Sequence, residues 1–427
     1  MNFLIVGSGP AGIFAAETIR GRDQESPITL VSQDPALAHS PVMVTYWIAG
    51  GRPQERLLFR DSSWAERKGV DVKLGCQAVG LDSGSRKLIL ANGQTISYHR
   101  MLIATGSSPI SLAIPGVGAK GVASLRSIRD AQTIVGAGAR VRQAVIIGGG
   151  FIGLKVACHL RERGVGVTVL EKEPKLAPRM LDRRASHVIA NELRKGGIRV
   201  EADVEVAEIL TEGEWVTGVH LKDGRVLSAQ GIIQAVGVRP NTEFLADSGI
   251  DLQGGVLVNE RMETNVSGVY AAGDVVMTID SITSERGNNA TWPAAARQGA
   301  VAGWNMAGGD RTYIHNFPLN ATTLFGLRVI AAGHPYHEGG AGVDVFKEEG
   351  AQSYRKMVMR AGRVIGFILI GDVSGAGFLL GLMKRKGEIP HDPLDLLRSR
   401  ISPQDYVLPH LGYRHGHLFD VPRGESR

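Results

Sequence analysis

The stretch that decides the fold is Phe3-Leu-Ile-Val-Gly-Ser-Gly-Pro-Ala-Gly12, near the start of a chain of 427 residues. Its apolar run at 3–6 predicts a buried strand, and Ile13–Arg20 behind the glycines predicts a helix. A second strand is expected at Ile28–Val31. This order of strand, glycine turn, helix and strand is typical of a βαβ unit that binds a dinucleotide.

Each glycine of the loop has its own expected task. Gly7 permits the tight turn, Gly9 lets the backbone approach a pyrophosphate, and Gly12 permits close packing of the helix on the strand. Pro10 and Ala11 begin the helix whose N-terminus would hold the phosphates. The lesser alternative is a tight turn that binds no ligand.

The same pattern returns in a second unit. A strand is expected at 144–147, a helix extends through Arg163, and a further strand follows at Val165–Leu170. The loop between the first strand and the helix should bind a second dinucleotide. Its expected ligands are Gly148, Gly150, Phe151, Ile152 and Gly153.

An acidic residue follows each unit. Asp34 lies just beyond the second strand of the first unit and could hold a ribose. Glu171 closes the last strand of the second unit, where a carboxylate accepts hydrogen bonds from the ribose of NAD and repels the 2′-phosphate of NADP. Lys172 and Arg179 lie nearby in the sequence, so binding of NADP stays an alternative, but the pattern favours NAD.

The spelling GxGxxG alone proves little in this chain. Glycine accounts for 56 of 427 residues, about twice its usual share. The stretch Gly116-Val-Gly-Ala-Lys-Gly121 has the same spelling, but Ile114-Pro115 precedes it instead of a strand. We interpret it as a linker between domains.

Charge and cysteine content narrow the class of protein. The net charge of +6 is scattered, so it indicates a solvated surface or the steering of an acidic electron-transfer partner, with nucleic acid disfavoured. Cys76 and Cys158 make no disulfide framework, and Cys158 fits a buried helix face, so we expect a reducing, cytoplasmic compartment. The apolar start, Met1–Ile19, is explained by the βαβ unit, and no membrane span is expected.

Four further motifs make the chain resemble the two-dinucleotide-binding flavoprotein reductases related to glutathione reductase. They are Ala104-Thr-Gly106, Gly237-Val-Arg-Pro-Asn241, Tyr270-Ala-Ala-Gly-Asp274 and Trp292-Pro-Ala-Ala-Ala-Arg-Gln-Gly299. The nearest branch resembles the rubredoxin and ferredoxin reductases, the NADH oxidases and the flavin domain of assimilatory nitrite reductase.

The resemblance implies an α/β fold with two Rossmann-like domains, one for FAD and one for NAD, and a C-terminal α+β interface domain. The expected boundaries are 1–109 with 240–316 for FAD, 110–239 for NAD, 317–401 for the interface domain and 402–427 for a tail. Asp274 would bind the ribityl chain, and the helix at Pro293 would direct its positive end at the flavin. Further FAD ligands are Val79, Ala104, Thr105 and Gly106, and Gly237 would contribute to the NAD site.

The C-terminal third has its own pattern. Strands are expected at Thr323–Ala332, Tyr354–Val358 and Arg363–Ile370, and a helix at Phe378–Lys384. Four histidines near the end are a weak metal candidate, because no carboxylate or cysteine stands at a ligand spacing. A docking segment for another subunit is preferred, and a disordered tail is the alternative. The histidines are His391, His410, His415 and His417.

Two departures from the family narrow the chemistry. The stretch His39–Trp47 contains no cysteine where the NADH oxidases and disulfide reductases of the family carry a redox cysteine, so electrons should leave the flavin directly. An ion pair that relatives place near the flavin is also missing, since its positions read Pro41 and Lys155. Lys155 either supplies a positive charge near the flavin or nicotinamide, or contacts only solvent and its neighbours.

These features predict an oxidoreductase that moves electrons between NAD(H) and a separate iron–sulfur protein, because the chain lacks a cluster-binding cysteine set. Leu37–Gly50 and Phe317–Gly333 resemble the flavin subunit of phenylglyoxylate dehydrogenase. That resemblance implies a homo- or hetero-oligomer with iron–sulfur and thiamine diphosphate subunits. The alternatives are a stand-alone ferredoxin, rubredoxin, quinone or oxygen reductase, and a redox-gated signalling module.

Overall fold

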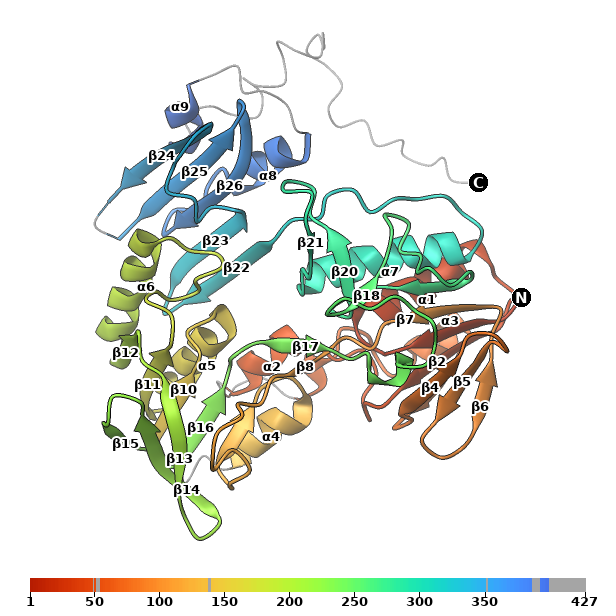
Figure 1. Ribbon diagram of the computed structural model, residues 1–427, viewed down its shortest axis with the longest axis horizontal. Helices are drawn as coiled ribbons and strands as arrows, with labels where there is room; N and C mark the ends of the chain where they lie inside the picture. Colours follow the sequence, from red (N-terminus) through yellow and green to blue (C-terminus); the bar gives the residue numbers. More distant parts are fainter. Residues whose placement is uncertain (49, 51–53, 137–139, 351, 386–391, 399–427) are drawn as a thin grey trace, which may run out of the picture.

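The computed structural model describes residues 1–427 except 49, 51–53, 137–139, 351, 386–391 and 399–427. The four C-terminal histidines and the expected tail at 402–427 therefore lie outside the described residues. Three five-stranded sheets organise the described part of the chain (Figure 1). We call the regions around them the N-terminal, central and C-terminal domains.

The N-terminal sheet is parallel and has the strand order β19-β7-β1-β2-β3. All four residues of its middle strand are buried, as expected for a strand covered on both faces. The strands are β1 (Phe3–Val6), β2 (Ile28–Ser32), β3 (Val70–Leu74), β7 (Arg100–Ile103) and β19 (Val269–Ala271). The helices are α1 (Pro10–Arg22), α3 (Trp64–Lys68) and α7 (Trp292–Met306).

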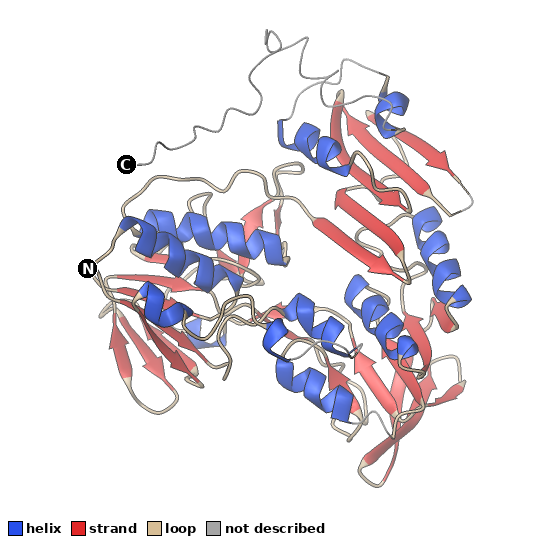
Figure 2. Cartoon of the chain, turned by 180° about the vertical axis from the view of Figure 1, so that it is seen from behind, coloured by secondary structure: helices blue, strands red, loops and turns tan. Residues whose placement is uncertain are grey.

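Helices α1 and α7 lie side by side on one face of this sheet (Figure 2). They approach so closely that a Cβ on Gly299 would lie 2.1 Å from the carbonyl oxygen of Ala11. A Cβ on Gly303 would likewise lie 2.5 Å from the carbonyl oxygen of Ala15. The glycines of α7 thus fix its N-terminus relative to the first glycine loop.

The central sheet repeats the same plan with the order β12-β11-β10-β16-β9. In both sheets the first strand of the βαβ unit occupies the middle, so the predicted internal repeat is confirmed. The strands are β9 (Val122–Ser124), β10 (Gln143–Ile147), β11 (Gly166–Glu171), β12 (Ile198–Ala202) and β16 (Gly231–Gln234). The helices are α4 (Ile128–Gly136), α5 (Phe151–Glu162) and α6 (Arg183–Lys195).

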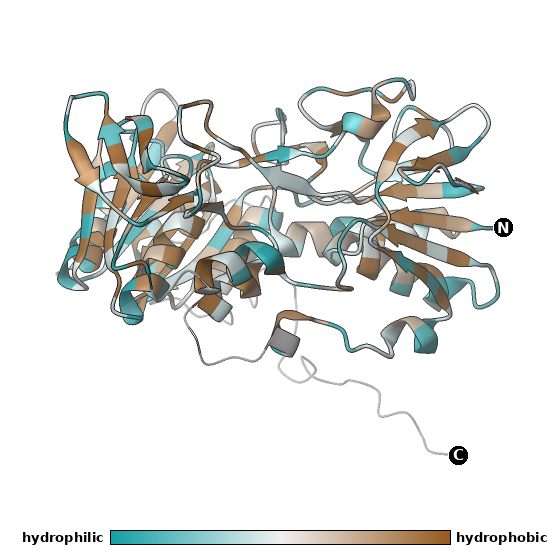
Figure 3. Ribbon diagram, turned by 90° about the horizontal axis from the view of Figure 1, so that it is seen from below, coloured by the Kyte–Doolittle hydropathy of each residue, from teal (hydrophilic) through white to brown (hydrophobic). Residues whose placement is uncertain are grey.

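Smaller elements complete these two domains, and apolar residues gather along the strands of both (Figure 3). The N-terminal domain adds β4 (Ala78–Asp82), β5 (Lys87–Leu90), β6 (Thr95–Ser97), β18 (Val256–Leu257), β20 (Val276–Ile279) and β21 (Arg286–Gly287). The central domain adds β13 (Val206–Glu212), β14 (Trp215–Leu221) and β15 (Val226–Ser228). Short 3-10 turns lie at Gln54–Leu57 and Glu243–Leu245.

The chain passes twice between the first two domains, and the two passages run together. Strand β8 (Ser107–Pro109) pairs with β17 (Val238–Pro240) as an antiparallel ribbon near the middle of Figure 1. The GxGxxG look-alike at 116–121 follows β8 as a series of turns, and no helix begins until Ile128. The stretch is thus no βαβ loop, and it packs against β13 and β14 of the central domain, where a Cβ on Gly116 would lie 2.1 Å from the carbonyl oxygen of Ile209.

The C-terminal domain is an antiparallel sheet with two helices. Its elements are β22 (Leu319–Leu324), β23 (Leu327–Gly333), β24 (Val343–Glu349), β25 (Tyr354–Arg360), β26 (Arg363–Ile370), α8 (Ala376–Arg385) and α9 (Pro393–Leu397). The single strand predicted at Thr323–Ala332 is wrong. The chain turns there, with Phe325 at φ 48° and Gly326 at φ 85°, and forms the β22–β23 hairpin.

A buried ion pair joins the C-terminal and central domains. Lys356 on β25 and Asp182 before α6 have side chains that are 0% and 1% exposed, with the Nζ and Oδ2 atoms 2.8 Å apart. Tyr354 donates its hydroxyl to the same oxygen at 2.6 Å. One face of the C-terminal sheet also shares a hydrophobic core with α5 and α6. In the described part of the chain, no helix has the length and apolar character needed to cross a membrane.

Candidate active site

The first glycine loop is shaped as the sequence predicts. Gly7 has φ 122°, and a Cβ there would lie 2.1 Å from the carbonyl oxygen of Ala104. A Cβ on Gly12 would lie 2.0 Å from the carbonyl oxygen of Gly7. Gly9 is different, because a Cβ there would meet nothing within 4 Å. The loop is therefore tight toward the protein and open at Gly9, where a pyrophosphate would approach.

The second glycine loop has the same geometry. Gly148 has φ 109°, and a Cβ on Gly153 would lie 2.2 Å from the carbonyl oxygen of Gly148. A Cβ on Gly150 would again meet nothing within 4 Å. Phe151 is half-buried, whereas Ile152 is 52% exposed at the start of α5. Both α1 and α5 begin without a side-chain cap, so their first N–H groups stay available to a ligand.

Each acidic residue lies beside its loop. Glu171 is buried and accepts hydrogen bonds from the N–H groups of Gly149 at 2.7 Å and Glu173 at 2.9 Å. It therefore also fixes the shape of the second loop. The side chain of Asp34 is 38% exposed, and its Oδ2 lies 3.7 Å from Nδ1 of His39. Burial lowers the pKa of His39, so that ring is neutral at pH 7 and leaves Asp34 free to bind a hydroxyl.

Reciprocal hydrogen bonds join the two segments that connect the N-terminal and central domains. Thr105 donates its hydroxyl to the carbonyl of Asn241 at 2.8 Å, and the Asn241 amide donates to the carbonyl of Thr105 at 2.9 Å. Gly106 adds a carbonyl that accepts the N–H of Asn241. Gly237, with φ 116°, stands just before β17. Val79 lies apart from this link, 48% exposed on β4.

Two side chains donate hydrogen bonds to the same carboxylate oxygen of Asp274. Arg126 donates to Oδ2 at 2.7 Å and Ser107 donates to the same atom at 3.0 Å. No described residue bonds Oδ1, so this oxygen stays available to a ligand hydroxyl. Arg126 is a candidate site residue that no local sequence pattern marks, because 148 residues separate it from Asp274.

The N-terminus of α7 lies beside this carboxylate. Gln298 accepts the N–H of Gly273 at 2.8 Å and so anchors the loop before Asp274 to α7. Pro293 occupies the first turn, and the N-cap Thr291 makes no side-chain cap. The indole N–H of Trp292 is buried and has no partner among the described residues. The Trp292 ring packs edge-on against Phe14 and Phe59, so its N–H is enclosed by protein. The backbone N–H groups of the first turn are the donors that would fit the carbonyl-rich edge of a flavin ring.

We expect Arg126→Ala to weaken FAD binding about tenfold, because a hydrogen bond to a charged group contributes about 1.5–3 kcal/mol. Asp274 would lose the partner that orients it. The measurement is the dissociation constant of FAD for the purified apoprotein. Arg129→Ala, an exposed arginine of the adjacent α4, is the matched control. An unchanged FAD affinity in Arg126→Ala would remove Arg126 from the site.

Comparison with known proteins follows the same division of the chain. Residues 1–299 match the model for pyridine nucleotide-disulphide oxidoreductases, and residues 318–387 match the rubredoxin NAD+ reductase C-terminal domain. The chain belongs to the pyridine nucleotide-disulphide oxidoreductase family. It is thus an oxidoreductase that binds FAD and NAD(H), and the predicted fold class and cofactors are confirmed.

Three relatives show how far the similarity extends. The epsilon subunit of NADH-dependent phenylglyoxylate dehydrogenase from Aromatoleum evansii is 31% identical, over 93% of this chain and 94% of that subunit. The NAD(P)H nitrite reductase of Bacillus subtilis is 29% identical over 91% of this chain, which spans only 48% of that enzyme. The crystal structure of NADH:rubredoxin oxidoreductase from Clostridium acetobutylicum is 26% identical with a TM-score of 0.78, and the match covers 94% of this chain and 99% of that one.

The helix that would carry a family redox cysteine is α2 (Pro41–Ile48), and it packs against α4 and α5. Pro41 only begins this helix. The α2 residue that faces Lys155 is Tyr46, whose ring centroid lies 4.7 Å from the Lys155 Nζ. Lys155 thus faces a residue that lies more than one helical turn beyond Pro41.

Neither cysteine lies on α2. Cys158 is 1% exposed on α5, and burial raises its pKa to about 12. Its prediction as a core residue is confirmed. Cys76 lies between β3 and β4 and donates to the carbonyl of Leu74 at 3.5 Å. A thiol with a raised pKa is a poor nucleophile at neutral pH, because the thiolate is the reactive form.

The double variant Cys76→Ser/Cys158→Ala should therefore keep a rate of flavin reduction by NADH within about twofold of the wild type, since no thiolate takes part. Its stability should fall slightly, by about 1 kcal/mol, because Cys158→Ala leaves a small cavity. Anaerobic stopped-flow spectroscopy measures the rate. A variant that retains FAD but is no longer reduced would show that a thiol carries electrons.

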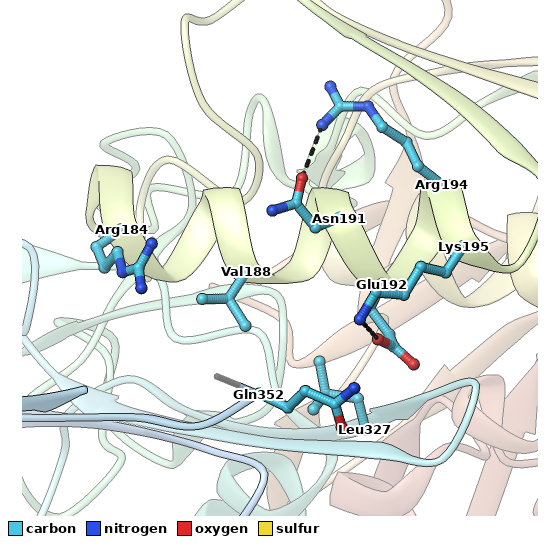
Figure 4. A pocket seen from close by; sticks show the side chains of 8 residues that line it. All are labelled: Arg184, Val188, Asn191, Glu192, Arg194, Lys195, Leu327 and Gln352. Carbon is cyan, nitrogen blue, oxygen red and sulfur yellow. Dashed lines mark hydrogen bonds and ion pairs between the residues drawn. The ribbon is translucent and has the colours of Figure 1, made fainter. Parts of the chain in front are cut away.

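A pocket lies away from the candidate site, between α6 and the C-terminal sheet (Figure 4). Three basic side chains line it, but each already has a partner. Arg184 pairs with Glu349 at 2.8 Å, Arg194 donates to Asn191 at 3.3 Å, and Lys195 lies 3.4 Å from Glu192. We assign no ligand to this pocket. Among the described residues, no group of three histidine, cysteine or carboxylate side chains could hold a metal ion.

Proposed function

We propose that the protein carries electrons from NADH through FAD to a separate iron–sulfur protein of the ferredoxin or rubredoxin type. The pair of open glycine loops in two linked sheets carries this proposal, since such loops would hold both dinucleotides in one chain. The C-terminal match to rubredoxin NAD+ reductases supports the choice of partner. Buried Cys158 and a cysteine-free α2 support direct transfer from the flavin.

The residues present divide the work of binding. The first N–H groups of α1 would hold the FAD pyrophosphate, Asp34 its ribose, and Oδ1 of Asp274 its ribityl chain. The first N–H groups of α5 would hold the pyrophosphate of NADH, and Glu171 its adenosine ribose. FAD supplies the conversion between a two-electron hydride donor and a one-electron acceptor.

The N-terminus of α7 would stabilise negative charge on the reduced ring, because helix N-termini carry a partial positive charge. Trp292 and Pro293 lie at this end. The hydrophobic core between the N-terminal sheet and its helices would exclude water from the side of the cofactor that faces the protein.

The two free cysteines suit a reducing compartment, so we place the protein in the cytoplasm.

The test of this function is reduction of an added acceptor. NADH, the purified holoprotein and a ferredoxin or rubredoxin are mixed without oxygen, and the visible spectrum of the acceptor is followed. We expect acceptor reduction much faster than oxidation of NADH by oxygen or a quinone alone. In separate runs oxygen or a quinone replaces the iron–sulfur protein, and NADH oxidation that is as fast in these runs would favour the stand-alone oxidase or quinone reductase. Tight, salt-sensitive DNA binding with negligible turnover would favour a signalling module.

We further propose that the chain is the flavin subunit of a complex that oxidises a 2-oxoacid, with iron–sulfur and thiamine diphosphate subunits. The near full-length similarity to the epsilon subunit of phenylglyoxylate dehydrogenase supports this candidate. In such a complex electrons would flow in reverse, from the clusters through FAD to NAD⁺. Affinity purification from native extract tests it: co-purified ferredoxin-like and thiamine-enzyme subunits are expected, and a lone homodimer would contradict it.

A further inference from the structure

Lys155 lies where three parts of the chain meet. It stands on α5, two residues beyond the last glycine of the NAD loop. Its Nζ donates to the carbonyl of Thr323 on β22 at 2.7 Å and lies 4.7 Å from the ring centroid of Tyr46 on α2. The central domain supplies the lysine, the C-terminal domain the carbonyl, and the segment after the FAD-binding βαβ unit the aromatic ring.

Two further residues on the same face of α5 hold α2 in place. His159 follows Lys155 by four residues and contacts the carbonyl of Thr45 through Nδ1. Arg163 follows by four more and donates to the carbonyl of Ile48 at 2.9 Å. These carbonyls belong to the last turn of α2, where helices leave oxygens unpaired and favour basic partners. Tyr46 is therefore held firmly against Lys155.

The charge of Lys155 has no balancing anion among its contacts. Its partners in the described part of the chain are a neutral carbonyl and the face of an aromatic ring, which attracts a cation. Burial lowers the pKa of neighbouring His159, and the charge of Lys155 lowers it further, so that ring is neutral at pH 7. Lys155 is thus a full positive charge at this junction, one turn closer to the NAD loop than the neutral His159 and two turns closer than Arg163.

We propose that Tyr46 and Thr323 position Lys155 as a fixed positive charge that favours reduction of the flavin by NADH. This inference rests on the proposed function. Hydride transfer oxidises NADH to NAD⁺ and leaves the electron pair, with one negative charge, on the reduced flavin. The two pyrophosphate sites lie at the starts of α1 and α5, and their redox rings would meet between the domains, where α2 and α5 touch. A nearby ammonium stabilises charge that develops there.

The test compares variants of the holoprotein by two measurements, the rate of flavin reduction by NADH and the midpoint potential of bound FAD. Lys155→Met should slow reduction about tenfold, as a loss of about 1.4 kcal/mol in the barrier implies, and make the potential more negative. Tyr46→Leu should shift both in the same direction. Tyr46→Phe and Lys155→Arg should recover most of the loss, because they keep the ring and the charge.

Lys222→Met is the matched control, since this lysine is 60% exposed and pairs with Glu205. A Lys155→Met protein with wild-type potential would overturn the proposal, even if its rate fell, because a structural role alone could slow the reaction. If Tyr46→Phe behaved like Tyr46→Leu, the ring contact would be refuted. If NADH failed to reduce the wild type, the proposed function would fall, while the potentials would still decide the role of Lys155.

Discussion

Gly9→Ala should weaken FAD binding by about tenfold or more, since each 1.4 kcal/mol or so of lost binding energy is a factor of ten. A methyl group on Gly9 meets no protein atom within 4 Å, so the fold should tolerate it. The methyl would instead occupy the space through which the pyrophosphate approaches the start of α1. The measurement is the FAD content and FAD dissociation constant of the purified variant.

Gly150→Ala is the paired variant in the second loop, and it should separate the two cofactors. A Cβ on Gly150 is equally free of protein atoms. The variant should retain FAD and be reduced by dithionite, yet need far more NADH for reduction. If Gly150→Ala lost FAD and Gly9→Ala lost only NADH affinity, the assignment of the loops would be reversed.

Contrasting variants control for the fold. A Cβ on Gly12 would lie 2.0 Å, and on Gly153 2.2 Å, from a backbone oxygen. Alanine at either position should therefore impair folding itself, measured as a lower melting temperature, whereas Gly9→Ala and Gly150→Ala should melt close to the wild type. Similar melting losses in all four variants would contradict this division.

Asp182→Asn should destabilise the protein by about 3–5 kcal/mol, because it leaves the ammonium of Lys356 buried without a carboxylate. Asparagine can still accept the N–H of Ala185, which Asp182 caps at the start of α6 at 2.9 Å, so the helix cap is kept. The loss should appear as a lower denaturation midpoint in urea. Glu349→Gln is the control, since its exposed pair with Arg184 should contribute about 1 kcal/mol or less.

The same pair gives a pH dependence with a defined sign. Burial alone would raise the pKa of Asp182, but hydrogen bonds from Lys356 and Tyr354 outweigh it and lower the pKa below its ordinary value. The stabilisation is therefore present above the pKa of the unfolded carboxyl, about 4, and is lost as the pH falls through the lower folded value. Asp182→Asn should lack this part of the acid sensitivity. An identical acid profile in variant and wild type would contradict the pairing.

Local patterns predicted the parts of the fold that depend on burial. The strands at Phe3–Val6 and Arg363–Ile370 have the expected bounds, because a continuous apolar run marks a strand buried on both faces. No strand is predicted at Val343–Glu349, since this strand is only partly buried and mostly polar. The β22–β23 turn was missed because Phe325 adopts a positive φ that its residue type rarely takes.

The residues of the candidate site also fall into two groups, those that local sequence patterns predict and those that they do not. The glycine loops and Glu171 could be predicted, since their roles depend on spacing within one βαβ unit. Arg126 and Tyr46 could not, because their partners Asp274 and Lys155 are remote in sequence and only tertiary packing brings them together.

The central claim is that electrons pass from NADH through FAD directly to another protein's iron–sulfur centre. Anaerobic stopped-flow mixing of the NADH-reduced holoprotein with an oxidised ferredoxin or rubredoxin tests it most directly. We expect the flavin to reoxidise in step with bleaching of the acceptor, at the same rate in the Cys76→Ser/Cys158→Ala variant. A flavin that stays reduced until oxygen or a quinone is added would contradict the claim.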